Sequence, residues 1–291
     1  MTRARARWLL SLVVATTLVA TASVALAVSP AGPRSARLTA QAARSIDVTR
    51  LPPAPWMGSR SAQAASGGRY LYAETDQTFV AGQRPRAIAA SFTVHHPRQV
   101  PIGSTRNDHS LVEMAVRAPN QHFSYIEAGW IVNGGNHAPQ LFVFWWRNGQ
   151  PHCYNFGCGF HRAGTGIRPG ATLHTGSVIR LGWVHARHAW WLRVNGRISG
   201  YYPDRKWNGT FTRAGSVQIF GEVATNRGIR VCDDMGNGRF ARSPRAAQVF
   251  QVAYTGGPPV RLRRGNVNAP RLYTLRRNSH HSFRYGGPGQ C

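Results

Sequence analysis

The sequence predicts an all-β protein, and three observations support that prediction. From about residue 66 onward, short apolar and aromatic runs alternate with Gly, Asn and Pro, which is typical of strands joined by tight turns. No stretch keeps a 3.6-residue apolar period long enough for an amphipathic helix. Nine tryptophans and 31 glycines favour an antiparallel β-sandwich of the lectin or jelly-roll kind, with aromatic residues packed on its sheets.

Eight segments carry the strand pattern. They are 87–94, 110–118, 123–132, 140–147, 177–185, 189–195, 216–224 and 246–255. Two Asn-Gly pairs, at 148–149 and 195–196, lie between such segments and predict tight hairpin turns. No internal repeat divides the chain, so residues 66–291 are expected to form a single domain.

The N-terminus predicts export. Three arginines precede the apolar run WLLSLVVATTLVATASVALA, which ends in small residues, as a secretory signal peptide does. Residues 1–27 are therefore expected to be removed, leaving a secreted protein without membrane contact. The alternative is a retained membrane anchor, because the run approaches the length of a bilayer span. Residues 28–65, rich in Ala, Ser, Pro and Arg, predict a linker or a short pro-segment.

The formal net charge is +26, with 36 Lys and Arg against 10 Asp and Glu. Such a charge would attract nucleic acid, anionic wall polymers or acidic substrates. The alternative is a solvated, arginine-rich surface without a dedicated partner. The arginines are scattered and no nucleic-acid motif is present, so we expect no specific nucleic-acid partner. The sequence makes no prediction of oligomeric state.

The four cysteines predict two disulfides, because an even count in an exported protein favours pairing. Cys153 and Cys158 are close neighbours, which leaves Cys232 and Cys291 as the second pair. The alternative is a zinc site, since histidines flank the first two cysteines. The spacing typical of structural zinc sites is missing, so neither a metal nor a cofactor is expected.

Two of only four glutamates lie within apolar, aromatic segments. Glu127 belongs to FSYIEAGW and Glu222 to SVQIFGEVA, where a carboxylate is costly to bury. On extended strands, each would share its face with large rings and small residues. The structural alternative for each is a buried carboxylate held by an arginine, or a residue at the rim of the sheet.

Paired buried carboxyls favour acid–base chemistry. Desolvation and mutual repulsion raise their pKa values, so that one member is a base and the other a proton donor. This chemistry suits hydrolysis in acid, with water activated by the ionised member. Glycosidases also use paired carboxyls, so the pattern alone leaves peptide and sugar substrates open.

An ordered series of motifs resembles the neprosin family of secreted β-sandwich glutamic peptidases, first associated with proline-directed cleavage in plants. The series is SYIEAGW (124–130), CYNFGCGF (153–160), AWWLRVNGRISGYYP (189–203), IFGEV (219–223), MGNGRF (235–240) and YGGPGQC (285–291). The resemblance implies that Glu127 and Glu222 are the catalytic pair, with base and acid in either order. It also implies a peptide or protein substrate and a preference around proline.

Several features qualify this resemblance. Plant members carry a large N-terminal activation domain, where this chain has only the short segment 28–65. They also have a cysteine upstream of the closing G-G-P-G segment, which 271–283 lacks. The family often has glutamine at the position of Glu113, which makes this glutamate the main rival for one member of the pair.

The aromatic residues near the two glutamates are candidates for the walls of a substrate cleft or for the core. They are Tyr125, Trp130, Trp145 and Trp146. The second function considered is a non-catalytic secreted β-sandwich module that binds an anionic polysaccharide or cell-wall polymer. Such binding does not require two buried carboxyls, which favours the acid-active peptidase.

Overall fold

The structure is a computed structural model that describes residues 68–99, 108–119, 123–133, 136–152, 154–156, 159–226 and 230–291. These residues belong to one compact unit, Gln41–Cys291, and form two antiparallel sheets. The expected signal peptide and linker, residues 1–65, lie outside the described residues. Within the described ranges, no helix is long and apolar enough to span a membrane.

The first sheet has seven strands in the order β13-β1-β11-β3-β4-β5-β6. They are β1 (Gly68–Thr78), β3 (His109–Arg117), β4 (Tyr125–Asn133), β5 (Asn136–Arg147), β6 (Gln150–Pro151), β11 (Ser216–Asn226) and β13 (Arg263–Val267). Strand β3 pairs along its whole length with β11 on one side and β4 on the other. Residues of these three strands that share a face are therefore brought side by side.

The second sheet has eight strands in the order β14-β15-β12-β2-β8-β9-β10-β7, so β14 lies at one edge and β7 at the other. They are β2 (Ala87–Thr93), β7 (His161–Arg162), β8 (Val178–Ala186), β9 (Ala189–Val194), β10 (Arg197–Pro203), β12 (Ala247–Thr255), β14 (Thr274–Ser279) and β15 (Ser282–Gly286). A 3-10 turn, η4 (Asp204–Trp207), follows β10.

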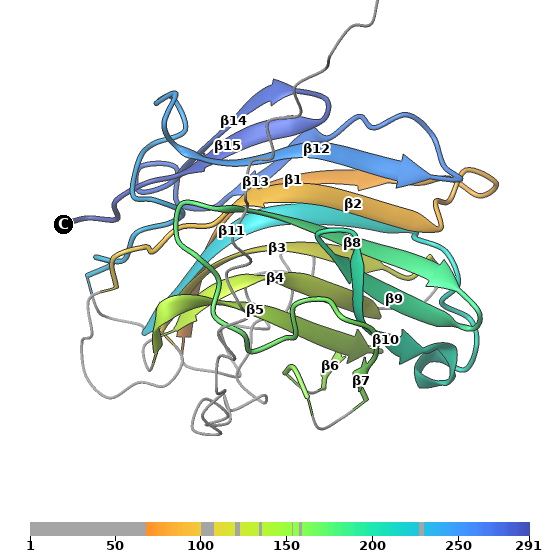
Figure 1. Ribbon diagram of the computed structural model, residues 1–291. Coiled ribbons are helices and arrows are strands. Elements are labelled where there is room, and N and C mark those ends of the chain that lie inside the picture. Colours follow the sequence, from red (N-terminus) through yellow and green to blue (C-terminus); the bar gives the residue numbers. More distant parts are fainter. Residues whose placement is uncertain are drawn as a thin grey trace, which may run out of the picture. The chain divides into compact units, whose positions relative to one another are not determined.

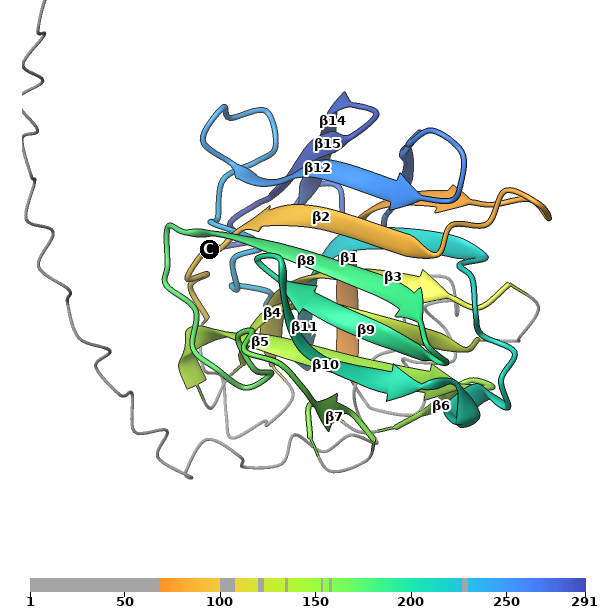
Figure 2. The same ribbon diagram turned by 45° about the vertical axis from the view of Figure 1, so that its right-hand side comes forward.

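The two sheets form two layers, with β3, β4 and β11 in one and β2, β8 and β9 in the other (Figures 1 and 2). One apolar core joins them, since Met114 and Ile126 of the first sheet cluster with Phe92 and Trp183 of the second. The indole N–H of Trp130 on β4 also donates to the carbonyl oxygen of Thr93 on β2, at 3.0 Å. The predicted all-β sandwich is confirmed.

The strand predictions agree with the structure in position. Each of the eight predicted segments overlaps a strand. Both Asn-Gly pairs form hairpin turns with positive φ at both residues: 50° and 79° at Asn148 and Gly149, and 49° and 80° at Asn195 and Gly196. Positive φ at both central positions defines the type I′ turn, which Asn-Gly favours because both residues tolerate this conformation.

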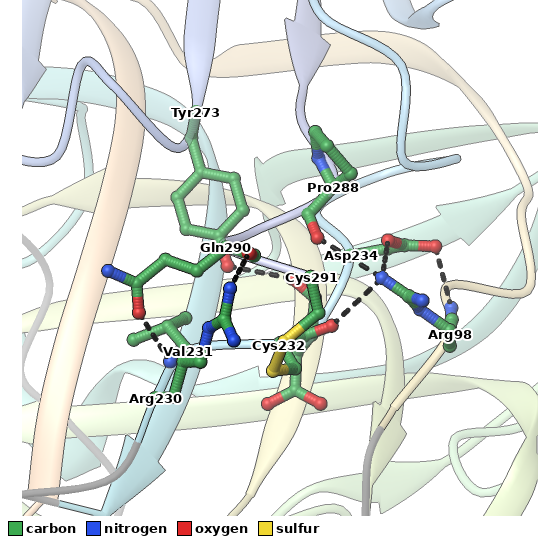
Figure 3. Close-up of a disulfide and its surroundings, with 10 residues drawn as sticks. Arg98, Arg230, Val231, Cys232, Asp234, Tyr273, Pro288, Gln290 and Cys291 are labelled. Carbon is green, nitrogen blue, oxygen red and sulfur yellow. Dashed lines mark hydrogen bonds and ion pairs between the residues drawn. A yellow bond between two sulfur atoms is a disulfide. The ribbon is translucent and has the colours of Figure 1, made fainter.

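The segment around Cys232 holds the C-terminal residues in place (Figure 3). Cys232 and Cys291 form one of the two predicted disulfides. Beside it, the backbone N–H of Gln290 donates to the carbonyl oxygen of Val231 at 2.6 Å, and Val231 N–H donates to Gln290 Oε1 at 3.0 Å. The guanidinium of Arg98 donates to the carbonyl oxygen of Cys232 at 3.3 Å. The C-terminal segment is therefore fixed covalently and by hydrogen bonds.

Candidate active site

Three glutamates lie on neighbouring strands of the seven-stranded sheet. In the strand register, Glu222 of β11 is opposite Leu111 of β3, and Glu127 of β4 is opposite Ala115 of β3. Glu113 lies on β3 midway between those two positions. Because alternate residues share a face, the three carboxyls form a diagonal row across β11, β3 and β4, with Glu113 in the middle.

The row faces away from the second sheet. On β4, Ile126 and Ala128 point into the core between the sheets. Tyr125 and Ile131 share the face of Glu127 and belong to a separate apolar cluster, which we call the outer-face cluster. Its members all come from the seven-stranded sheet: Tyr70, Tyr72, Leu111, Ala115, Tyr125, Ile131, Phe142, Phe144, Trp146, Phe220 and Ala224. The carboxyls therefore lie among aromatic rings, as the strand pattern predicts.

All three carboxyls are nearly removed from solvent. The exposed fraction is 4% for Glu113, 4% for Glu127 and 2% for Glu222. Burial is the largest effect on each, and it raises the pKa of all three carboxyls above the usual range because the charged form loses its hydration. Their protonated forms are therefore favoured further toward neutral pH than in an exposed glutamate.

Glu222 is surrounded by hydrogen-bond donors. Nε2 of His109 lies 2.7 Å from Oε1 of Glu222, and the hydroxyl of Tyr72 also hydrogen-bonds this carboxyl. Tyr72 is directly opposite Glu222 on β1, and His109 is on β3. Both interactions lower the pKa of Glu222 and so offset part of the effect of burial. Donors aimed at a carboxylate stabilise its ionised form.

Glu127 has a different environment. Its side chain hydrogen-bonds that of Glu113, and its Oε2 accepts from the indole N–H of Trp146 at 3.3 Å. The bond to Glu127 raises the pKa of Glu113, so Glu113 is the donor. The charge of Glu222 raises the pKa of both Glu113 and Glu127. Two carboxyls can share a hydrogen bond only if one is protonated, so this pair retains a proton.

Gly129 makes room for the middle carboxyl. It lies opposite Glu113 in the register of β3 and β4. A Cβ at Gly129 would collide with the carbonyl oxygen of Val112 and lie 2.8 Å from Cα of Glu113. The two backbones approach closely here, so a side chain at this position would displace β3 where Glu113 is held.

The fourth glutamate, Glu74, lies on the same face, which the sequence did not predict. In the register, Glu74 of β1 is opposite Phe220 of β11, which in turn is opposite Glu113. Its Oε1 accepts from Nε2 of Gln218 at 2.9 Å, and the backbone of Asn266 also hydrogen-bonds it. Burial raises the pKa of Glu74 to about 7. All four glutamates of the chain therefore share one face of one sheet.

The four aromatic candidates divide between the two faces. Tyr125 and Trp146 lie on the face of Glu127, with ring centroids 5.2 Å apart and the rings stacked. Trp130 and Trp145 instead belong to the core between the sheets. Only Tyr125 and Trp146 are thus placed to line a substrate site.

The other predicted site features fall outside this face. Cys153 and Cys158, the second predicted disulfide, lie outside the described residues. Within the described ranges, no group of three or more His, Cys, Asp or Glu side chains is placed to hold a metal ion.

Sequence reasoning missed two residues that contact Glu222. His109 precedes Glu113 by four residues but lies one residue before the predicted strand 110–118. Strand alternation, extended by that one residue, would have placed both side chains on one face. Tyr72 lies on β1, a strand that the sequence pattern did not predict. Its position follows only from the pairing of β1 with β11.

Comparisons with solved structures find low identity and partial likeness. A scytalido-glutamic peptidase with a transition state analog inhibitor matches at 10% identity and a TM-score of 0.49, covering 76% of this chain and 99% of that one. An eqolisin-family peptidase in complex with a tripeptide matches at 8% and 0.42, covering 76% and 99%. A tetrameric galectin from the ball sponge Cinachyrella sp. matches at 10% and 0.35, covering 62% and 99%. Likenesses at this level do not establish function.

The family comparison is decisive. The model of the Neprosin family matches residues 106–288, well over half of the chain. The matched range contains Glu113, Glu127 and Glu222, and it begins after β1 and β2. The chain therefore belongs to the neprosin family, and it is a hydrolase of the glutamic peptidase type that acts on peptides or proteins.

Proposed function

We propose that the protein is a secreted, acid-active endopeptidase in which Glu127 and Glu222 form the catalytic pair, with a preference for proline near the scissile bond. The observation that carries this proposal is the contrast between their surroundings. Burial raises the pKa of Glu222, and its two donors, His109 and Tyr72, lower it. The pKa of Glu127 is raised well above the usual range by burial and by the charge of Glu222, although Trp146 and Glu113 donate to it. Carboxyls whose surroundings set their pKa values apart suit an acid–base pair.

Glu222 is assigned the role of base. Burial raises its pKa, and the hydrogen bonds from His109 and Tyr72 counteract that rise, which keeps an ionised fraction available in acid. An ionised Glu222 accepts a proton from a water molecule as the water oxygen bonds to the carbonyl carbon of the substrate.

Glu127 is assigned the role of proton donor. In the resting pair Glu113 donates to Glu127, and the shared proton passes along this hydrogen bond to Glu127 before it is transferred. Glu127 gives its proton to the carbonyl oxygen as the tetrahedral intermediate forms. On collapse, the C–N bond breaks, the amide nitrogen takes the proton held by Glu222, and a hydroxyl of the intermediate returns a proton to Glu127. Atoms and charges balance, and both carboxyls regain their starting states. Glu113 and Glu127 are expected to titrate as a unit, since they share a hydrogen bond.

The register supports a substrate that lies across β3. Glu127 and Glu222 are on the two strands that flank β3, and they are offset along it by four residues. Glu113 lies between them in the register, so a substrate placed between the two carboxyls would pass over Glu113. Tyr125 and Trp146 lie beside the proton donor. Their rings are buried and stacked on each other, and the proposal is that a proline ring of the substrate packs against this pair.

We also propose that the protein is exported through its N-terminal segment. Residues 1–27 would act as a signal peptide, 28–65 as a linker or short pro-segment, and 66–291 as the peptidase domain. Support comes from the sequence of the first 27 residues. N-terminal sequencing of the protein from culture medium tests the boundaries. A mature chain that retained residue 1 would contradict export by cleavage.

The experiment that tests the pair is digestion of a peptide library between roughly pH 3 and 7, the range in which coupled carboxyls titrate. Glu127→Gln, Glu222→Gln and the double variant should each lose at least about a hundredfold in kcat/KM. The double variant should lose little more than either single one, because residues acting as a unit are not additive. Glu74→Gln is the matched control, because it makes the same substitution at a buried glutamate on the same face of the seven-stranded sheet.

Two outcomes would count against the proposal. If the wild-type enzyme cut no peptide anywhere in the acidic range, the assignment of acid activity would be wrong. If Glu127→Gln lost no more activity than Glu74→Gln, Glu127 would not belong to the pair. Cleavage sites without enrichment of proline would remove only the proposed preference.

A further inference from the structure

Acidic and basic residues occupy different parts of the described structure. Every acidic residue in the described ranges is buried or half-buried. The two half-buried ones, Asp76 and Asp234, interact with Arg263 and Arg98 respectively. The exposed surface of the described residues therefore presents arginines without exposed carboxylates to neutralise them.

The C-terminal part of the chain concentrates this charge. Residues 235–291 contain ten arginines and no Asp, Glu or Lys. The arginines are Arg239, Arg242, Arg245, Arg261, Arg263, Arg264, Arg271, Arg276, Arg277 and Arg284. A segment of 57 residues with ten positive charges and no negative one creates a positive field around the strands it forms.

Three of these arginines line one groove. The groove lies along β14, has a volume of about 480 Å³, and also contains Phe240, Pro270 and Leu275 among its walls. Arg242, Arg271 and Arg276 are exposed, and the side chain of none of them forms a hydrogen bond or ion pair with the described residues. Their guanidinium groups are therefore available to a ligand, beside a partly apolar wall.

Two neighbouring arginines, Arg277 and Arg284, differ from the three groove arginines because their side chains donate hydrogen bonds to backbone carbonyls. Nη1 of Arg277 donates to the carbonyl oxygen of Leu262 at 2.8 Å. Nη1 of Arg284 donates to the carbonyl oxygen of Ser243 at 2.9 Å. These two side chains stabilise the fold around the groove, whereas the three groove arginines do not.

We propose that this groove, formed by Arg242, Arg271 and Arg276, binds an acidic polysaccharide. The planar guanidinium group presents a fork of N–H donors that fits carboxylate and sulfate oxygens in pairs. Three such groups around one open groove match the repeated negative charges of a sugar polymer. The groove lies at the edge of the eight-stranded sheet, apart from β3, β4 and β11, so a bound polymer would leave the glutamate face free.

The surface favours polysaccharide over nucleic acid. Proteins that bind single strands stack the bases on exposed aromatic side chains. In the described residues, the exposed large apolar side chains are Val80, Ile167 and Val178. No Phe, Tyr or Trp is exposed, and Phe240 in the groove wall is half-buried. Charge recognition without base stacking fits a polymer whose negative groups project from sugar rings. The inference concerns tethering of the enzyme and does not depend on the catalytic pair.

The test measures binding of the full secreted protein to heparin and to polygalacturonate, which carry sulfate and carboxylate groups respectively. Arg242→Gln, Arg271→Gln and Arg276→Gln are combined in one variant. The matched control combines Arg168→Gln, Arg197→Gln and Arg205→Gln. These arginines are also exposed, and their side chains form no hydrogen bond or ion pair with the described residues. Arg197 is on β10, near the opposite edge of the sheet. Both variants lose the same charge.

We expect the groove variant to bind at least one of the two polymers about tenfold more weakly at 0.1 M salt, given the typical energies of three exposed ion pairs. The control variant should bind nearly as wild type, and both should keep the wild-type melting temperature and peptidase activity. The polymer that shows the difference identifies sulfate or carboxylate as the ligand chemistry. A third variant with lysine at all three positions should bind between wild type and the glutamine variant.

Equal weakening in the two glutamine variants would overturn the proposal, because binding would then depend on overall charge. Tighter binding to single-stranded RNA than to either polysaccharide, lost in the groove variant, would assign the groove to nucleic acid instead. Absence of measurable binding to both polysaccharides at 0.1 M salt would also overturn it.

Discussion

Nε2 of His109 lies 2.7 Å from Oε1 of Glu222, and both side chains are almost completely buried. A donor to a buried carboxylate stabilises its charged form, so His109 is expected to set the pH at which Glu222 becomes ionised. If Glu222 is the base, activity falls as this carboxyl is protonated. The acidic limb of the pH–rate profile therefore reports on the contact.

His109→Leu should move that acidic limb to higher pH, by roughly one unit for the loss of a hydrogen bond to a charged group. His109→Gln keeps an N–H donor and should shift the limb less. The measurement is kcat/KM across the acidic range for both variants. An acidic limb unchanged in His109→Leu would show that Glu222 is not the titrating base.

Glu113→Gln should keep activity within about tenfold of wild type, because the glutamine amide can still donate to Glu127. Its alkaline limb should move to lower pH, since Glu127 would lose the carboxyl with which it shares a proton. The pH profile of kcat/KM measures both effects, with Glu74→Gln as the control. Loss of activity in Glu113→Gln together with full activity in Glu222→Gln would replace Glu222 by Glu113 in the pair.

The raised pKa of Glu74 predicts that the folded state is more stable in acid than at neutral pH. This pKa is about 7 in the fold against 4.5 for the unperturbed group, so the folded state binds the proton more tightly than the unfolded chain. The stabilisation is fully present below about pH 4.5 and is lost as the pH rises to about 7. A shift of this size corresponds to about 3 kcal/mol.

Urea unfolding at pH 4 and pH 8 measures this effect in wild type and in Glu74→Gln. The wild type should lose stability between the two pH values, and the variant should lose less because glutamine does not ionise. Other buried glutamates contribute in the same direction, so the difference between the two proteins isolates Glu74. The same pH dependence in both would contradict the assigned pKa.

Gly129→Ala should destabilise the protein by about 1–3 kcal/mol and reduce activity, because its Cβ would overlap Val112 and displace Glu113. Gly182→Ala on β8 is the matched control. A Cβ there meets its nearest neighbour, Cβ of Ala89, at 3.3 Å. Thermal melting and kcat/KM together test the pair of variants. Equal, small effects would show that β3 and β4 tolerate a side chain between them.

Strand alternation explains what the sequence could predict. The segments that form β4 and β11 alternate between apolar residues on one face and glutamates among aromatic rings on the other. This pattern indicated that Glu127 and Glu222 lie on strands, and it also indicated which neighbours share their faces. The same rule separates Tyr125 from Trp130, which differ by an odd number of residues. It also places Trp145 and Trp146 on opposite faces, but only the register of β4 and β5 shows which of them shares the face of Glu127.

The sequence could not predict β1 or the role of its residues. Polar residues such as Glu74, Asp76 and Gln77 interrupt its apolar pattern, although Glu74 and Gln77 are buried in the structure. Their burial depends on pairing with β11, which lies about 140 residues further along the chain. Contacts at such separation leave no local signal, so the environment of Glu222 required the sheet topology.

The absence of exposed carboxylates among the described residues has a consequence for the behaviour of the protein in solution. Surface guanidinium groups stay charged at all pH values that proteins tolerate, and the sequence pI is about 11.7. The molecule therefore has no isoelectric point in the acidic or neutral range, and mutual repulsion should keep its colloidal stability nearly constant there. Added salt, rather than a change of acidity, is expected to bring copies together or to release the protein from oppositely charged surfaces.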